Sequence, residues 1–258
     1  MMRARDEVPM KELARLFDEY MNHEPRFGEA VFGGEVQFAR AFVREEALPE
    51  EDHTEVLDWE RITRLVETAS AVSVGLCACR HKNSHLGTAC DMPQRTCISL
   101  NGGAETMIHS GISERITAQE GLRLIEECKE LGLAQIGANV KRSVTFVCNC
   151  CGCCCTLSNG IRTFNIKNAI VSSNWIAQID TEKCTACGRC EKGCPVQALA
   201  FEDGGGQGKR QLILDESLCL GCGVCSTLCK NGGISMTPLT KRVFNPEKSF
   251  ERSVPNAI

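Results

Sequence analysis

The sequence predicts an α+β chain in which a mostly helical, cysteine-rich N-terminal domain precedes a small module of short β-hairpins and helices. Three observations predict this fold class. Helical periodicity fills most of the first 70 residues, short apolar runs lead into cysteine-rich loops, and one four-cysteine pattern occurs twice near the C-terminus. The expected divisions are a helical region at 1–70, a cysteine-rich α/β region at 71–173, the repeated module at 174–240 and a tail at 241–258.

The first 70 residues carry three helical patterns. Residues 9–22 and 58–68 place apolar side chains at helical intervals, and residues 36–48 form a further candidate helix that ends before a proline. The glycines and short apolar pairs of residues 27–34 favour a loop. We therefore expect three helices ahead of the first cysteine.

A short apolar run at residues 71–75 predicts a buried strand that leads into the first cysteine group. Four cysteines then fall within 21 residues, among glycine, proline and polar residues that favour loops. They are Cys77, Cys79, Cys90 and Cys97. Such cysteines can hold a [4Fe–4S] cluster. The alternatives are a zinc ion that also uses His81 or His85, a redox-active dithiol, or structural cysteines. Arg80, His81 and Lys82 would either lower the pKa values of these thiols and tune a cluster by their charge, or be merely exposed loop residues.

The clearest helical pattern covers residues 117–131. Thr117 and Glu120 form a capping box at its start, and Gly132 is placed to end it. A strand at residues 144–147 is expected to follow. This strand leads into the second cysteine group.

In the second group, six of eight consecutive residues are cysteine. They are Cys148, Cys150, Cys151, Cys153, Cys154 and Cys155. Side chains of adjacent residues diverge, so six thiols here cannot all bind one small ion from one face. The simplest interpretation is a further cluster that takes three or four of them, while the rest complete the centre begun at Cys77 and Cys79. A disulfide or persulfide exchange site and one larger cluster spanning both groups are the alternatives.

The repeated pattern is Cys-x-x-Cys-x-x-Cys-x-x-x-Cys. Its first copy comprises Cys184, Cys187, Cys190 and Cys194, and its second Cys219, Cys222, Cys225 and Cys229. The same offset carries Asp180 onto Asp215, so the segment is a duplicated unit. Strands are expected at 175–179, 199–201 and 211–214, the last two joined by a glycine-rich turn at 204–208.

The duplicated unit resembles the bacterial-type ferredoxin module, which holds two [4Fe–4S] clusters and in which the fourth cysteine of each run ligates the other cluster. The resemblance implies two ligand sets. One cluster takes Cys184, Cys187, Cys190 and Cys229, and the other takes Cys219, Cys222, Cys225 and Cys194. The second copy departs from the pattern at Lys230, where a proline is usual, so its exit turn is expected to differ.

The whole chain resembles a group of uncharacterised iron–sulfur proteins of anaerobic bacteria and archaea. Three upstream segments carry this resemblance: Cys77-Ala-Cys79-Arg80, Cys90-Asp91-Met92-Pro93 and the run from Cys148 to Cys155. The resemblance implies two [4Fe–4S] clusters in the C-terminal module and one or two additional iron–sulfur clusters upstream of it.

Composition excludes several classes of function. The net charge is −4 and the pI about 5.8, which gives no basic surface for nucleic acid. No apolar run approaches the roughly 20 residues of a membrane span, so no direct membrane insertion is expected. Nineteen cysteines without a secretory signal predict the reduced cytoplasm of an anaerobe. No motif for a flavin, NAD or ATP site is present.

The sequence therefore predicts an electron-transfer protein. Its two ferredoxin clusters would pass electrons to or from an additional N-terminal cysteine-ligated centre, and its partners would be redox proteins or subunits of an oxidoreductase complex. The alternatives are a catalytic oxidoreductase whose N-terminal cysteine loops reduce a substrate, and a redox sensor or regulatory subunit.

Overall fold

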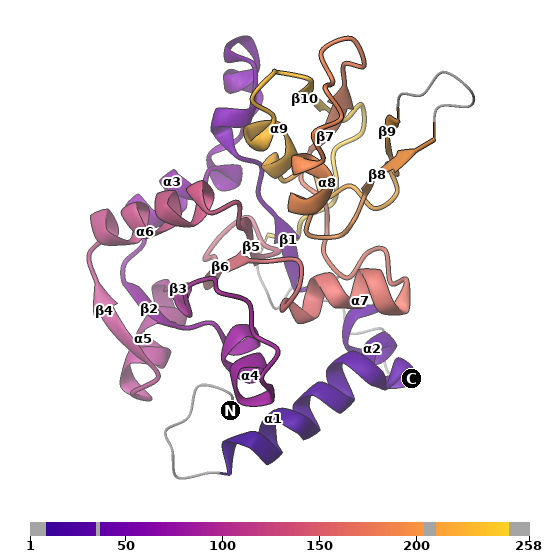
Figure 1. Cartoon of the computed structure of the whole chain (residues 1–258). Helices are drawn as coiled ribbons and strands as arrows, with labels where there is room; N and C mark the ends of the chain where they lie inside the picture. Colours follow the sequence, from indigo (N-terminus) through magenta and orange to yellow (C-terminus); the bar gives the residue numbers. More distant parts are fainter. Residues whose placement is uncertain (1–8, 35–36, 204–209, 248–258) are drawn as a thin grey trace, which may run out of the picture.

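The computed structural model describes residues 9–34, 37–203 and 210–247. Helices and strands are mixed throughout, which confirms the α+β class, and the repeated cysteine module stands beside the N-terminal part (Figure 1). Among the described residues, no helix combines the length and apolar character that a bilayer span requires.

The N-terminal part is built on a six-stranded sheet with the strand order β1-β5-β6-β3-β2-β4, in which every neighbouring pair is antiparallel. Its strands are β1 (Ala39–Ala41), β2 (Val72–Leu76), β3 (Arg95–Leu100), β4 (Ser113–Ile116), β5 (Ala134–Ala138) and β6 (Phe146–Cys150). The region is thus richer in strands than its helical periodicity indicates. The strands expected at 71–75 and 144–147 correspond to β2 and β6. The other four strands were not expected, because they show too little alternation of apolar and polar residues to be recognised from sequence.

Helices and short helical turns surround this sheet (Figure 1). The helices are α1 (Met10–Asp18), α2 (Pro25–Phe32), α3 (Ile62–Glu67), α4 (Ala78–Leu86), α5 (Asn101–His109), α6 (Ala118–Glu130) and α7 (Thr156–Phe164). The turns are η1 (Glu19–His23), η2 (Glu45–Ala47), η3 (Glu50–Glu55) and η4 (Asp58–Glu60). The helices expected at 9–22, 58–68 and 117–131 are confirmed. The Thr117 hydroxyl accepts from the Glu120 N–H at 3.1 Å, and the Glu120 carboxylate accepts from the Thr117 N–H at 2.8 Å.

Two expectations for the N-terminal region are wrong. Of the helix expected at 36–48, the described residues 37–48 contain only the short turn η2, because Ala39–Ala41 pairs with β5 and the pairing outweighs local helix propensity. Residues 27–34 are not a loop, because α2 covers most of them. The signals missed there were Glu24, whose carboxylate accepts from the Arg26 N–H, and Pro25 at the first helical position.

The C-terminal module contains two short hairpin-like pairs and two short helices. β7 (Trp175–Ile179) pairs antiparallel with β10 (Ile234–Pro238), and β8 (Leu199–Glu202) pairs with β9 (Gln211–Leu214). The helices are α8 (Arg189–Gly193) and α9 (Val224–Leu228). The strands expected for this module are confirmed, whereas the glycine-rich turn at 204–208 lies outside the described residues.

One apolar core joins the two parts of the chain. Ile136 of the sheet and Ile161 of α7 belong to the same buried cluster as Val196, Leu220 and Val224 of the C-terminal module. A second cluster packs residues 43–56 against the module's strands. The module is therefore fixed against the sheet rather than connected to it by a free linker.

Candidate metal centres

The two upstream cysteine groups meet at one edge of the six-stranded sheet. β2 and β6 run in the same direction, because each pairs antiparallel with β3 between them. β2 ends just before Cys77, and β6 ends at Cys150. β3 runs the opposite way, so its start, which contains Cys97, lies at the same edge. Strand order therefore brings together cysteines that are far apart in the sequence.

A cavity of about 90 Å³ lies at this edge. The cysteines that line it, named here the inner group, are Cys77, Cys79, Cys97, Cys148, Cys150 and Cys155. Cys151 reaches it from the rim. The inner group takes members from both cysteine groups of the sequence.

Two helices begin at the inner group. Cys77 is the N-cap residue of α4, which replaces part of the loop expected between Cys77 and Cys97. Cys155 is the N-cap residue of α7. The first helical residue of α7, Thr156, places its hydroxyl 3.6 Å from the Cys79 sulfur. The positive ends of both helix dipoles therefore favour negative charge at the cavity.

The inner thiols contact one another and differ in acidity. Hydrogen bonds from Cys155 and Cys77 hold the pKa of Cys79 well below its usual value. In contrast, hydrogen bonds from the Cys150 thiol to Cys148 and Cys155, together with burial, raise the pKa of Cys150. Hydrogen bonds thus link Cys77, Cys79, Cys155, Cys150 and Cys148 in one series along the cavity.

Arg80 lies behind these thiols and is fully buried, at 0% exposure. Burial opposes its charge, but the thiols of Cys77 and Cys151 more than offset this and raise the pKa of Arg80. One terminal nitrogen donates to Thr96 and, at 3.0 Å, to the carbonyl of Asn149. Its Nε and Nη1 atoms have no oxygen or nitrogen acceptor, and a hydrogen bond to the Cys151 thiol joins the guanidinium to the sulfurs. A buried guanidinium is stabilised by negative charge beside it, and the thiolates of a bound cluster would supply such charge.

A buried polar network supports Arg80. The Asn149 side chain donates to the Thr96 carbonyl at 2.9 Å and accepts from Gln135 at 3.1 Å. Asn149 lies between Cys148 and Cys150, so its side chain points to the opposite face of β6 from theirs. This network fixes the strand that carries the two cysteines.

Four cysteines, of which Cys151 also lines the cavity, gather next to it and are named here the outer group. They are Cys90, Cys151, Cys153 and Cys154, and their sulfur atoms all lie within 4.8 Å of one another. The Cys90 sulfur is 3.7 Å from that of Cys151 and 3.7 Å from that of Cys154, and the Cys153 and Cys154 sulfurs are 3.9 Å apart. Cys90 comes from the first cysteine group of the sequence and the other three from the second.

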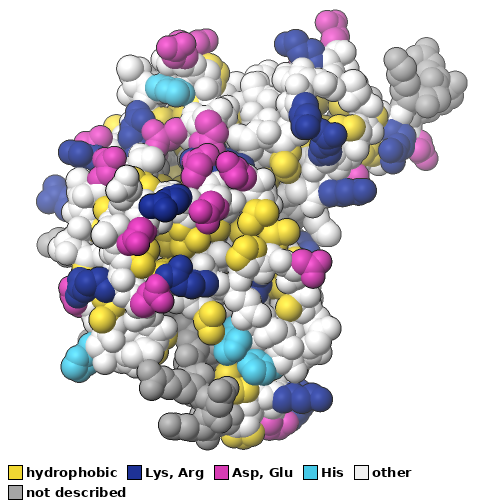
Figure 2. Space-filling model, turned by 60° about the vertical axis from the view of Figure 1, so that its left-hand side comes forward, with side chains coloured by type: hydrophobic (Ala, Val, Ile, Leu, Met, Phe, Trp, Pro, Cys, Tyr) yellow, Lys and Arg dark blue, Asp and Glu magenta, His cyan; other side chains and the backbone are white. Residues whose placement is uncertain are grey.

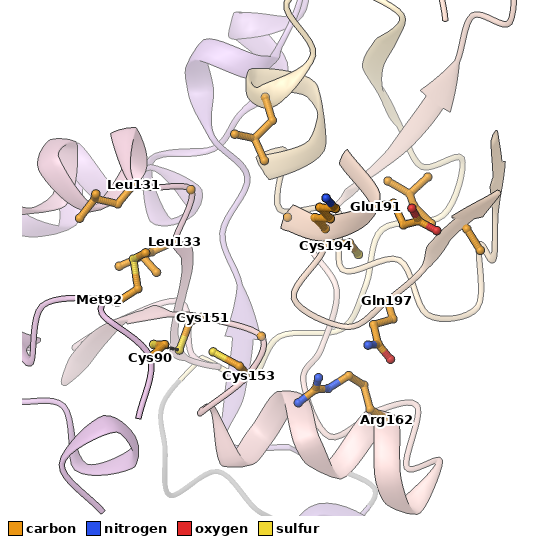
Figure 3. A pocket seen from close by; sticks show the side chains of 17 residues that line it. Cys90, Met92, Leu131, Leu133, Cys151, Cys153, Arg162, Glu191, Cys194 and Gln197 are labelled. Carbon is orange, nitrogen blue, oxygen red and sulfur yellow. Dashed lines mark hydrogen bonds between the residues drawn. The ribbon is translucent and has the colours of Figure 1, made fainter. Parts of the chain in front are cut away.

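The outer group opens into a cleft of about 720 Å³ between the two parts of the chain (Figure 3). Cys153 faces this cleft from one side, and Cys194 of the C-terminal module lines the other. Arg162 extends into it from α7 and has no ion-pair partner among the described residues. Gly152 packs against the module so closely that a Cβ there would lie 2.8 Å from the Pro195 carbonyl oxygen.

The two copies of the repeated pattern fold alike. Gly188 and Gly223 occupy equivalent positions, have φ angles of 75° and 77°, and precede α8 and α9. The sulfur of the last cysteine in each run accepts a backbone N–H at 3.2 Å, from Ala198 to Cys194 and from Gly233 to Cys229.

The fourth cysteine of each run faces the other run. Burial raises the pKa of Cys190, and the neighbouring thiols that raise it further are Cys184 and Cys229. Burial likewise raises the pKa of Cys194, with a further contribution from Cys219 of the second run. Burial also raises the pKa values of Cys222 and Cys225, and the Cys194 thiol raises them further.

Arg44 connects the N-terminal part to the second run, and sequence reasoning missed it. Its backbone N–H donates to the Cys222 carbonyl at 3.2 Å, and its guanidinium donates to Thr227 at 2.6 Å and to the Leu133 carbonyl at 2.9 Å. Burial lowers the pKa of Arg44, while Cys222 and Cys225 act in the opposite direction. No local pattern marks it, because its partners are far away in the sequence.

The outer surface of the module carries basic side chains. Lys and Arg side chains lie on this part of the surface in Figure 2. The exposed cations of the module include Lys183, Arg189, Lys192 and Lys230. Cys187 is exposed in the same module. The first cysteine run is therefore accessible from this surface.

Residues 183–232 match the family model described as a 4Fe-4S dicluster domain. The C-terminal module contains this match and is named here the dicluster domain. The match and the many cysteines support iron–sulfur binding by the chain.

A curated relative, the uncharacterized protein MJ0749 of Methanocaldococcus jannaschii, is 31% identical over 64 residues. The match covers 25% of this chain and 22% of the relative, so the chain spans about a fifth of that protein's length. No solved structure matches the chain.

Proposed function

We propose that this chain transfers electrons between a redox partner and a third, N-terminal cluster by way of the two clusters of the dicluster domain. In this proposal the first cluster is held by Cys184, Cys187, Cys190 and Cys229, and the second by Cys219, Cys222, Cys225 and Cys194. The position of Cys229 beside Cys190, and of Cys194 beside Cys219, supports this division. Each bound cluster takes up and releases single electrons.

The inner group is proposed to hold the third cluster, with Cys77, Cys79, Cys150 and Cys155 as its ligands. These four thiols are linked by mutual hydrogen bonds around the cavity. Cys148 and Cys97 lie in the same wall. The observation that carries the proposal is Arg80, a fully buried guanidinium whose charge is balanced by the thiols of Cys77 and Cys151 beside the cavity.

The contact between Gly152 and Pro195 supports exchange between the two parts of the chain. Gly152 follows Cys151 at the rim of the inner cavity, and Pro195 follows Cys194 of the dicluster domain. The N-terminal centre and the second cluster are therefore neighbours. The exposed Cys187 and the surrounding cations support contact with a redox protein or oxidoreductase subunit at the first cluster.

Replacing an inner cysteine tests the proposal. Cys79→Ser, purified anaerobically, should lose about 4 Fe per chain while the EPR signals of the two dicluster-domain clusters persist. Cys128→Ser is the matched control, since Cys128 is buried on α6 and belongs to neither group. If Cys79→Ser keeps the full iron content of the wild type, the inner group holds no cluster.

The cleft favours a second candidate, a reductase that acts on a small anionic molecule. Its volume of about 720 Å³ suits a small ligand, and Arg162 lines it without an ion-pair partner among the described residues. Candidate anions, such as small carboxylates and thiols, should then alter the EPR spectrum of the reduced protein. A spectrum that none of them alters argues against this candidate.

A further inference from the structure

We infer that the outer group binds a single divalent metal ion in a tetrahedral site of four thiolates, separate from the clusters. Its ligands are Cys90, Cys151, Cys153 and Cys154. The proposed function assigns no role to these four sulfurs.

The spacing of the sulfurs fits one ion. A metal–sulfur bond of about 2.3 Å in a tetrahedron separates the ligand sulfurs by about 3.8 Å. Three of the six sulfur–sulfur separations in the outer group are 3.7, 3.7 and 3.9 Å, and the others lie within 4.8 Å. One ion placed among these sulfurs would therefore reach its ligands at ordinary bond lengths with little movement of the chain.

The dicluster domain provides an internal comparison. In a [4Fe–4S] cluster each thiolate binds a different iron atom, so its four sulfurs stand further apart than those around one ion. Within residues 9–34, 37–203 and 210–247, the outer group is the one set of at least three potential ligands that gathers within 4.8 Å. The eight cysteines of the dicluster domain do not gather in this way, as expected of cysteines that each bind a different iron atom of a cluster.

The chain builds this compact site from two segments. α4 ends at Gly87, which adopts the left-handed conformation with φ of 72°, and the chain then turns toward Cys90. The other three ligands lie in the tight turn that follows β6. Gly152 lies inside this turn and against Pro195, so an ion here would fix the turn on which the dicluster domain rests.

Charge and exposure also suit a small ion. Four thiolates and one divalent ion leave a net charge of about −2, and Arg80 lies beside Cys151 to offset part of it. Cys154 is 3% exposed, whereas Cys153 is exposed at the cleft. Thiolate ligands favour zinc, and iron is the other ion that four thiolates hold in this geometry. Zinc would make the site a structural clamp, because it has no redox chemistry.

Metal analysis and X-ray absorption on the anaerobically purified full chain test the inference. We expect about one zinc per chain, with a single shell of four sulfurs at about 2.3 Å and no neighbouring metal atom. One mononuclear iron with the same sulfur shell and a high-spin EPR signal would support the same site with the other ion. Neither ion at this site, or an outer group bound to a multi-iron cluster, would overturn it.

Two variants assign the ion to these residues. Cys90→Ser should lose the single ion, and Cys153→Ser, on the exposed side, should weaken its retention against the chelator EDTA. Both should keep the iron of the three clusters. Cys128→Ser should retain the ion as wild type does.

A loss of about 4 Fe from Cys90→Ser would instead show a cluster at the outer group. An intact single ion together with only about 8 Fe in the wild type would uphold this inference while refuting the third cluster.

Discussion

Cys90 and Cys151 are 61 positions apart in the sequence, yet their sulfur atoms lie 3.7 Å apart. This pair joins the segment after α4 to the turn after β6. It also shows how the structure divides the cysteines, since each of the two upstream groups contributes cysteines to both the inner and the outer group. Replacing all the cysteines of either sequence group would therefore remove cysteines from both the inner and the outer group.

Arg80→Met should selectively affect the N-terminal cluster. Removing a buried positive charge disfavours the more negative reduced state, so the reduction potential of that cluster should fall by on the order of 100 mV. EPR-monitored redox titration measures this. Arg80→Lys, which keeps the charge, should shift the potential less. Equal shifts at all clusters would contradict the placement of Arg80 beside one centre.

Arg44→Met should affect the second cluster of the dicluster domain instead. Arg44 is 2% exposed and lies beside Cys222 and Cys225, so its loss should lower the potential of their cluster, again by on the order of 100 mV. EPR-monitored redox titration measures this potential as well. Each variant is the control for the other, because Arg44→Met should shift only the second cluster and Arg80→Met only the N-terminal cluster. The prediction fails if both variants move the same signal.

Gly152→Val should loosen the contact between the two parts of the chain. Its Cβ would lie 2.8 Å from the Pro195 carbonyl oxygen and 2.9 Å from the Pro195 Cα, and backbone atoms cannot move aside cheaply. We expect a loss of about 1–3 kcal/mol in the free energy of unfolding, measured by anaerobic denaturation. Gly102→Ala, where no atom lies within 4 Å of the added Cβ, should leave stability nearly unchanged.

The docking of α1 on α4 should weaken only in acid. Burial opposes ionisation of Asp18, but hydrogen bonds from Lys82 and Asn22 outweigh it and lower the pKa of Asp18. The stabilisation is therefore complete above the unfolded pKa of about 3.9 and is lost as the pH falls through the lower folded value. Pulsed hydrogen exchange of α1 amides should show protection that is constant between about pH 5 and 8 and falls below about pH 4.

Asp18→Asn should remove this acid transition and weaken docking at neutral pH, because it leaves Lys82, which is 1% exposed, without its charged partner. We expect a local cost of roughly 1–3 kcal/mol, discounted for the partly exposed Asp18. Protection equal to that of wild type at pH 7 would show that the ion pair does not hold the helix.

The dicluster domain could be predicted from sequence because its signal is local. Each run places its cysteines at fixed short intervals, and the duplication marks Gly188 and Gly223 as equivalent turns. The strands of the module follow from apolar runs on both sides of the cysteines. The family match at 183–232 confirms this part.

The six-stranded sheet and the division of the upstream cysteines could not be predicted, because both depend on pairing between distant segments. β1 is three residues long and is defined by its partner β5. Cys150 and Cys151 are adjacent in the sequence, yet they belong to the inner and the outer group. The alternation of Cys148, Asn149 and Cys150 was the one local sign that some of these side chains point to opposite faces.

Iron and acid-labile sulfide analysis of the anaerobically purified wild-type chain tests the central claim most directly. Two clusters in the dicluster domain and a third at the inner group predict about 12 Fe and about 12 sulfide per chain. About 8 Fe and 8 sulfide, with no further iron bound upstream, would contradict an N-terminal cluster and confine the redox chemistry to the C-terminal domain.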